Sequence, residues 1–255
     1  MNQLLVLDLD GTLLRNDKTV SEETIDSLIE FKNRDNRILF ATARPPRDAY
    51  KYVPQKLRDN PIICYNGACM IDGKEILYKK EMSKDTVHQI IKQSEKSGYH
   101  QICFEINDKL YSNFDTSDFF GKVPTEIVDL TKLDMKTVYK VIICNKMPIS
   151  QDFLAILPDT CKGVVTDNGR LCQIMDQEVS KWNSIQSLVK AWTIKNEDII
   201  AFGDDYNDLD MIKHAGIGVA MGNAEKVVKE SANFVTDTNM NEGVAKYLKE
   251  HILQK

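Results

Sequence analysis

Short apolar runs recur through the first and last thirds of the chain, and segments with apolar residues at helical spacing lie between them. The runs lie at residues 4–7, 38–41, 61–64, 199–202, 216–220 and 234–235. Runs of this length that end in turn residues predict buried strands of a parallel sheet. In the last third, Ile185, Leu188 and Val189 fall on one face of a predicted helix. The alternation of strands and helices predicts an α/β fold with a Rossmann-like parallel sheet.

Residues 82–179 show a different pattern, in which most strand signals follow one another without a long helix between them. A helix around residues 87–91 precedes predicted strands at 102–106, 138–144, 163–166 and 171–175, with an irregular stretch after the first of them. This order is typical of an antiparallel α+β unit. We therefore expect an inserted α+β domain at 82–179 and a core made from 1–81 and 180–255.

The first apolar run ends in two carboxylates, Asp8 and Asp10, followed by Gly11, which permits a sharp turn. Open α/β sheets bind ligands at such strand ends. A carboxylate that is ionised at neutral pH needs no base to attack phosphorus. The pattern favours phosphoryl transfer, with Asp8 as nucleophile and Asp10 as the acid that protonates the leaving oxygen and then activates water. The plainer alternative is that both residues close a strand and start a turn.

Other polar residues stand at the corresponding ends of later elements. Thr42 follows the run 38–41, so its hydroxyl and the amide of Ala43 are placed to hold a phosphate oxygen, although an ordinary helix cap is the alternative. Lys181 begins a helix, where the helix dipole disfavours a cation, and we interpret it as a phosphate ligand rather than a solvated lysine. Three carboxylates crowd residues 204–208, which requires a cation or exposure to solvent.

These segments, Asp8-Leu-Asp10-Gly-Thr12, Thr42, Lys181 and 203–208, resemble the four motifs of the haloacid dehalogenase-like (HAD) phosphatase superfamily. Segments 218–224 and 236–244 are similar to its Cof-type branch, which the chain resembles over essentially its whole length. The resemblance implies a Mg²⁺-dependent phosphatase that acts through an aspartyl-phosphate on small phosphorylated metabolites such as sugar phosphates. It also implies that residues 82–179 form a cap domain on a HAD-like core.

The resemblance implies roles for individual residues. Asp8 and Asp10 are the expected catalytic pair. The expected metal set is Asp8, Asp10 (through its main-chain carbonyl), Asp204 and, behind them, Asp208. The residues expected to hold phosphate are Leu9, Thr42, Ala43, Lys181 and Asn207. The family usually has glycine after the threonine and after the lysine, where this chain has Ala43 and Trp182; we expect these differences to affect fit and substrate choice rather than the chemistry.

Composition narrows the range of partners. The 255 residues carry a net charge of −5 and 42% hydrophobic residues, without the basic excess typical of proteins that bind nucleic acid or anionic membranes. No apolar stretch approaches the roughly 20 residues of a membrane-spanning helix, and the N-terminus has no signal-peptide pattern. We therefore expect a cytoplasmic protein, a monomer or weak homodimer, whose partner is a small phosphate ester.

The six cysteines form no Cys-x-x-Cys pair, which predicts free, packed thiols.

Three other functions use similar residues. A phospho-receiver switch also combines aspartates with Thr, Lys and Mg²⁺, but this chain is long for a receiver and an inserted domain would hinder docking of a partner. A phosphomutase shares the first chemical step and would show rapid isomerisation with slow release of phosphate. A non-catalytic regulator that binds a phosphometabolite would show no turnover, and the intact acidic set argues against it.

Overall fold

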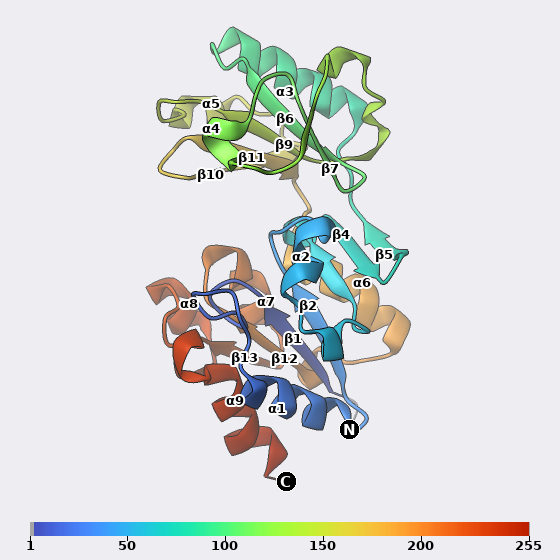
Figure 1. Cartoon of the computed structure of the whole chain (residues 1–255), viewed down its shortest axis with the longest axis vertical. Coiled ribbons are helices and arrows are strands. Elements are labelled where there is room, and N and C mark those ends of the chain that lie inside the picture. The colour runs from blue at the N-terminus through green and yellow to red at the C-terminus, as the bar shows by residue number, and fades with distance from the viewer. Residues whose placement is uncertain (1–2, 255) are drawn as a thin grey trace. The chain divides into compact units, whose positions relative to one another are not determined.

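The chain divides into two compact units in a computed structural model that describes residues 3–254. The core unit combines residues 1–79 and 180–255, and the inserted unit spans Lys80–Val179 (Figure 1). Each unit has a sheet of its own. The core unit is therefore assembled from the two ends of the chain.

An eight-stranded sheet forms the centre of the described core unit, in the order β14-β13-β12-β1-β2-β3-β4-β5. The strands are β1 (Leu4–Asp8), β2 (Arg37–Ala41), β3 (Ile62–Cys64), β4 (Cys69–Asp72), β5 (Glu75–Lys79), β12 (Ile199–Gly203), β13 (Ile217–Ala220) and β14 (Phe234–Val235). The strands from β14 to β3 are parallel, and β4 and β5 add an antiparallel edge. Every residue of β1 is buried, as its continuous apolar run predicts. The predicted α/β fold is confirmed.

The chain leaves the centre of this sheet in two directions. The strands β2 and β3 extend the sheet on one side of β1, and β12, β13 and β14 extend it on the other. Because parallel crossovers are right-handed, α1 (Glu22–Lys32) and α7 (Leu209–His214) cover opposite faces of the sheet. The carboxyl ends of β1 and β12 therefore flank a topological switch point, the position where open α/β sheets bind ligands.

The core unit contains further helices. They are α2 (Pro46–Tyr52), α6 (Lys181–Trp192), α8 (Lys226–Ser231) and α9 (Gly243–Tyr247), and a π-helical segment (Leu248–Leu253) follows α9. Helix α1 ends at Lys32. Asn36 lies beyond a turn in which Asp35 has a φ of 60°, and its side-chain amide donates to the carbonyl of Phe31.

The inserted unit contains a six-stranded sheet in the order β10-β11-β9-β6-β7-β8. Its elements are α3 (Lys84–Lys96), β6 (Gln101–Ile106), β7 (Lys109–Ser112), α4 (Ser117–Phe120), β8 (Thr125–Ile127), β9 (Val138–Cys144), α5 (Gln151–Ala155), β10 (Cys161–Thr166) and β11 (Leu171–Asp176). The prediction of a purely antiparallel sheet is wrong at one edge, because β8 runs parallel to β7. Both α4 and β8 are too short for a hydrophobic period to reveal them.

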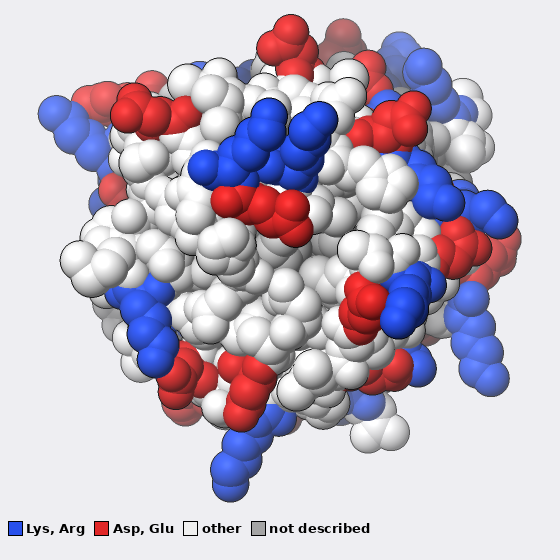
Figure 2. All heavy atoms as spheres, turned by 90° about the horizontal axis from the view of Figure 1, so that it is seen from above, with Lys and Arg blue, Asp and Glu red and all other residues white. Residues whose placement is uncertain are grey.

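Side-chain burial and charge agree with the composition. All six cysteines are free and buried, which confirms the prediction of packed thiols. On the face shown in Figure 2, lysine and arginine side chains lie beside aspartate and glutamate side chains, so positive charge is not gathered into one field there. No helix within residues 3–254 has the length and apolar character needed to cross a membrane.

Candidate active site

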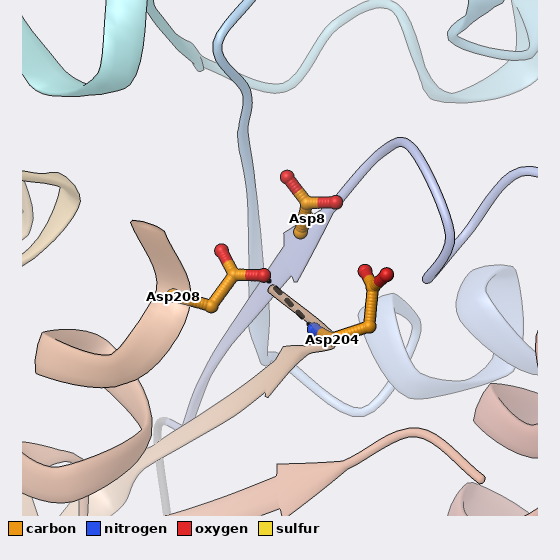
Figure 3. Close-up of side chains that lie close together, drawn as sticks. All are labelled: Asp8, Asp204 and Asp208. Atoms are coloured by element: carbon orange, nitrogen blue, oxygen red, sulfur yellow. Dashed lines mark hydrogen bonds between the residues drawn. The ribbon is translucent and has the colours of Figure 1, made fainter. Parts of the chain in front are cut away.

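Three carboxylates converge at the switch point of the core sheet (Figure 3). Asp8 ends β1, Asp204 follows β12, and Asp208 ends the 3₁₀ turn Tyr206–Asp208. One oxygen atom from each carboxylate lies within 4.8 Å of the other two. Asp8 and Asp208 are buried and Asp204 is half-buried. Like charges held this close require positive charge nearby.

Lys181 places one positive charge inside this cluster. Its side chain is fully buried, and its Nζ lies 2.5 Å from Asp8 Oδ1 and 2.5 Å from Asp208 Oδ1. Ser180 caps α6, and Lys181 is the first residue of that helix. The other oxygen of Asp208 accepts the N–H groups of Asp204 (2.9 Å) and Asp205 (3.2 Å). Both oxygens of Asp208 therefore bind protein donors, and Asp208 orients Lys181 and the turn after β12.

The electrostatics of the cluster are unbalanced. Burial raises the pKa of Asp8 well above its usual value, the ion pair with Lys181 opposes this shift, and the charges of Asp208 and Asp204 add to it. Burial is also the main cause that raises the pKa of Asp204 to about 7, against the hydrogen bond from Thr12. Burial lowers the pKa of Lys181, but the charges of Asp208 and Asp8 outweigh that effect and raise it. One fixed cation does not fully compensate three carboxylates.

Residues after β1 hold Asp204 in position. Thr12 Oγ1 donates to Asp204 Oδ1 over 2.7 Å. Gly11 has a φ of +82°, and a Cβ atom there would lie only 2.1 Å from Asp204 Oδ2. Both the backbone conformation and the lack of space therefore require glycine at this position. The Gly11 carbonyl accepts a hydrogen bond from Asn223 Nδ2 over 2.8 Å. The sequence identified Thr12 and Asn223 only as members of motifs, and their contacts with residues about 200 positions away gave no local signal.

Asp10 lies apart from the buried cluster and is held by two cations. Arg44 donates from Nε and Nη2 to its two oxygens over 2.6 and 2.7 Å, and Lys18 Nζ lies 2.8 Å from Oδ1. The Arg44 guanidinium also pairs with Asp48 and lies 4.2 Å from the ring centre of Tyr52. Burial raises the pKa of Asp10, but the hydrogen bonds from Arg44 and Lys18 outweigh it and hold that pKa below its usual value. Sequence reasoning gave no role to Arg44.

The threonine and the alanine that follow β2 occupy the edge next to Asp8. Asp8 pairs with Ala41 in the parallel register, so Thr42 lies one residue beyond that pair. Its N–H donates to the carbonyl of Ile63, and its Oγ1 accepts the N–H of Arg44 over 3.2 Å. Ala43 is not among the residues with positive φ. The glycine that is usual at this position is therefore not needed for the backbone conformation.

The other expected phosphate residues lie around the same strand ends. Leu9 follows Asp8 with its side chain buried, and its carbonyl accepts the N–H of Leu14. Asn207 is exposed, and its Nδ2 donates to Asn66 Oδ1 over 2.9 Å. Trp182 stacks on His214 of α7 with ring centres 5.6 Å apart, so its ring packs on the core unit.

Comparisons with known proteins match the whole chain. A sequence profile described as haloacid dehalogenase-like hydrolase matches residues 5–248. The chain belongs to this hydrolase family. The 5-amino-6-(5-phospho-D-ribitylamino)uracil phosphatase YitU of Bacillus subtilis is 32% identical to this hydrolase over 97% of each chain. The pyridoxal phosphate phosphatase YbhA of Escherichia coli is 27% identical over 98% of this chain and 99% of its own. A haloacid dehalogenase-like hydrolase of Bacteroides thetaiotaomicron has a crystal structure with a TM-score of 0.84, at 26% identity and coverage of 98% and 99%.

The prediction of a HAD-type phosphatase is thereby confirmed, and the enzyme is a hydrolase that acts on phosphorylated small molecules. Its acidic cluster suits a hard divalent cation, which prefers carboxylate oxygens. Burial is the main cause of the raised pKa values of Asp8 and Asp204, and the charges of neighbouring carboxylates add to it. These two carboxylates are therefore the parts of the cluster best suited to face a cation.

Proposed function

We propose that this hydrolase cleaves phosphate monoesters of small metabolites with Mg²⁺ and forms an aspartyl-phosphate on Asp8. The observation that carries the proposal is the buried contact of Lys181 with Asp8 at the switch point, beside the half-buried carboxylate of Asp204. A salt bridge between Lys181 and Asp8 with a purely structural role would not need the carboxylate of Asp204 close to it. These residues suit a reaction in which the Asp8 carboxylate attacks a phosphate ester. Because both groups are anions, positive charge must be brought to the site to offset their repulsion.

In the first step, a carboxylate oxygen of Asp8 attacks phosphorus, and the bond between phosphorus and the ester oxygen breaks. The departing oxygen takes a proton from Asp10. In the second step, a water molecule gives a proton to Asp10, and the oxygen of that water attacks the phosphorus of the aspartyl-phosphate. The carboxylate of Asp8 is restored, inorganic phosphate leaves, and Asp10 again holds its proton. Lys181 keeps the Asp8 carboxylate in one orientation throughout.

The ion pairs of Asp10 with Arg44 and Lys18 favour the second step of this cycle over the first. Arg44 and Lys18 favour its ionised form, which is the form that accepts a proton from water. The acid step needs the protonated form. Asp10 therefore has to leave at least one of these cations before it protonates the departing oxygen.

The residues that would bind the phosphoryl group follow the three strands β1, β2 and β12 or begin helix α6. They are the Thr42 hydroxyl, the main-chain amides of Leu9 and Ala43, the Lys181 ammonium and the Asn207 amide. Asp8, Asp204 and the main-chain carbonyl of Asp10 would hold Mg²⁺, with Asp208 behind them. When bound, the ion supplies positive charge that offsets the repulsion between Asp8 and the substrate.

The inserted unit is proposed to be the cap that selects the substrate. The phosphoryl group is the same in every monoester, so the residues that bind it cannot distinguish one metabolite from another. The segment Lys80–Val179 is a separate compact unit with its own hydrophobic core, which supports an independent role. Exchange of this segment for that of a relative with another preference should transfer the preference, mainly in kcat/KM. A folded chimera that keeps the original preference would place selectivity in the core unit.

A screen of phosphate esters with Mg²⁺ tests the proposed activity. The phosphorylated ribitylaminouracil and pyridoxal phosphate named for the two relatives are the first compounds to include, beside sugar phosphates. Turnover that requires Mg²⁺ and stops in chelator is the expected result. The absence of hydrolysis of every ester in Mg²⁺ would contradict the proposal, and full activity in excess chelator would contradict the metal requirement.

A further inference from the structure

The turn Tyr65–Gly67, which follows β3, has an unusual backbone. Its three residues all have positive φ, with values of 53° for Tyr65, 58° for Asn66 and 110° for Gly67. Each non-glycine residue in this region costs on the order of 1 kcal/mol or more, and a bulky residue such as tyrosine is rarer there than asparagine. A strained backbone persists only where the surrounding structure holds it in place.

The N–H of Tyr65 donates to the carbonyl of Arg44 over 3.0 Å, and three further contacts of this turn lead to residues of the proposed phosphate site. The N–H of Asn66 donates to the carbonyl of Thr42 over 3.0 Å. The side-chain oxygen of Asn66 accepts the Nδ2 hydrogen of Asn207 over 2.9 Å. Gly67 lies against the backbone that leads into Lys181, since a Cβ atom there would be 2.1 Å from the Ser180 carbonyl oxygen and 2.9 Å from the Lys181 nitrogen.

These contacts join segments that are distant in sequence. Thr42 follows β2, Lys181 begins α6 and Asn207 lies in the turn after β12. Asn66 and Asn207 are 141 positions apart. An asparagine amide has two N–H groups, and the bond to Asn66 uses one of them and fixes the plane of the amide. The second N–H of Asn207 is then directed by Asn66 rather than left to rotate.

We propose that Asn66 is a positioning residue for the phosphate site, which acts through Asn207, and that the strained turn Tyr65–Gly67 sets the spacing of Thr42, Lys181 and Asn207. The proposal rests on the proposed function, because it assumes that these three residues receive the phosphoryl group. Its physical basis is preorganisation: donors that are already fixed lose little freedom when an anion arrives.

The test measures binding of inorganic phosphate by calorimetric titration in Mg²⁺, so it does not depend on turnover. Asn66→Gly keeps a residue that tolerates positive φ and removes only the side chain. We expect it to weaken phosphate binding about five- to tenfold, in the range of one lost hydrogen bond between uncharged groups. Asn168→Gly is the matched control, since Asn168 is exposed, has a φ of 52° and lies in the inserted unit; it should bind phosphate as the unchanged protein does.

A double-mutant cycle separates positioning from direct binding. If Asn66 acts through Asn207, the double variant Asn66→Gly/Asn207→Ala should bind phosphate as weakly as Asn207→Ala alone. Losses that add in the double variant would overturn this route. Phosphate binding by Asn66→Gly within twofold of the unchanged protein would overturn the proposal altogether.

Kinetics and folding separate the remaining explanations. With an active ester, Asn66→Gly should raise KM more than it lowers kcat. The Asn66→Gly variant should bind phosphate more weakly and still have a urea unfolding midpoint close to that of Asn168→Gly. If the variant loses binding because it is unfolded, the result contradicts a positioning role for Asn66. If the unchanged protein binds phosphate but hydrolyses no ester, the proposed function fails while the role of Asn66 is still measured.

Discussion

Replacement of Lys181 by methionine removes the only cation buried between Asp8 and Asp208 in the described cluster. The three carboxylates have oxygens within 4.8 Å of one another. At an effective dielectric constant of about 20, two unit charges at that distance repel by about 3 kcal/mol. Loss of one partner from a buried ion pair typically costs 3–5 kcal/mol, a large part of the 5–15 kcal/mol by which domains are stable.

We therefore expect Lys181→Met to lose about 3–5 kcal/mol of unfolding free energy in chelator at pH 7.5, measured by urea denaturation. The loss should be smaller in Mg²⁺, because a divalent cation supplies part of the missing charge. It should also be smaller at pH 5.5. The pKa of Asp8 is already raised, and without Lys181 it rises further, so a proton neutralises the carboxylate in the folded state.

Lys190→Met is the matched control, because Lys190 is an exposed residue of the same helix. Its unfolding free energy should change by less than about 0.5 kcal/mol and should not depend on Mg²⁺. Equal stability of the two variants in chelator would show that the buried charge is compensated in another way, and the electrostatic reasoning would be refuted.

Three further results are expected. Asp8→Asn keeps the shape of the side chain but removes the attacking charge, so phosphate release should fall at least about 1,000-fold with an unchanged circular dichroism spectrum; near-normal release would exclude the covalent mechanism. Because the pKa of Asp204 is raised to about 7, the metal-free protein should lose stability as the pH rises from about 4 to 7, and Mg²⁺ should raise Tm more at pH 8 than at pH 5.5; a Mg²⁺ effect independent of pH would contradict this. Gly11→Ala should lower kcat at least about tenfold through displacement of Asp204, whereas Gly73→Ala, at a φ of +56° with no atom within 4 Å of the added Cβ, should leave kcat unchanged.

The core sheet and the acidic residues of the candidate site could be predicted because their signals are local. A buried apolar run that ends in Asp8 and another that ends before Asp204 each indicate a parallel strand with a carboxylate at its end. The α/β pattern then brings such ends to one edge of the sheet. No contact between the two motifs had to be known for this inference.

Other features depend on contacts between distant residues and gave no such signal. The positive φ of Tyr65 is unusual for a bulky residue, and it follows from packing against the segments of Thr42 and Ser180 rather than from the local sequence. The role of Arg44 arises because its guanidinium reaches from the loop after β2 to Asp10 in the loop after the neighbouring strand β1. The short elements α4 and β8 contain four and three residues, too few for a hydrophobic pattern to repeat often enough to be recognised.

The pairing of β1 with β12 has a consequence for the order in which the protein forms during synthesis. Leu4 pairs with Ile199, so β1 leaves the ribosome nearly two hundred residues before one of its two neighbours in the sheet. At translation rates of roughly 5–20 residues per second, this delay lasts on the order of 10–40 s. Meanwhile the nascent chain carries a strand of five residues, all buried in the finished protein, with one edge unpaired. The inserted unit is one continuous segment that is synthesised within that interval. It can therefore fold before the core sheet, whose strands come from both ends of the chain, is complete.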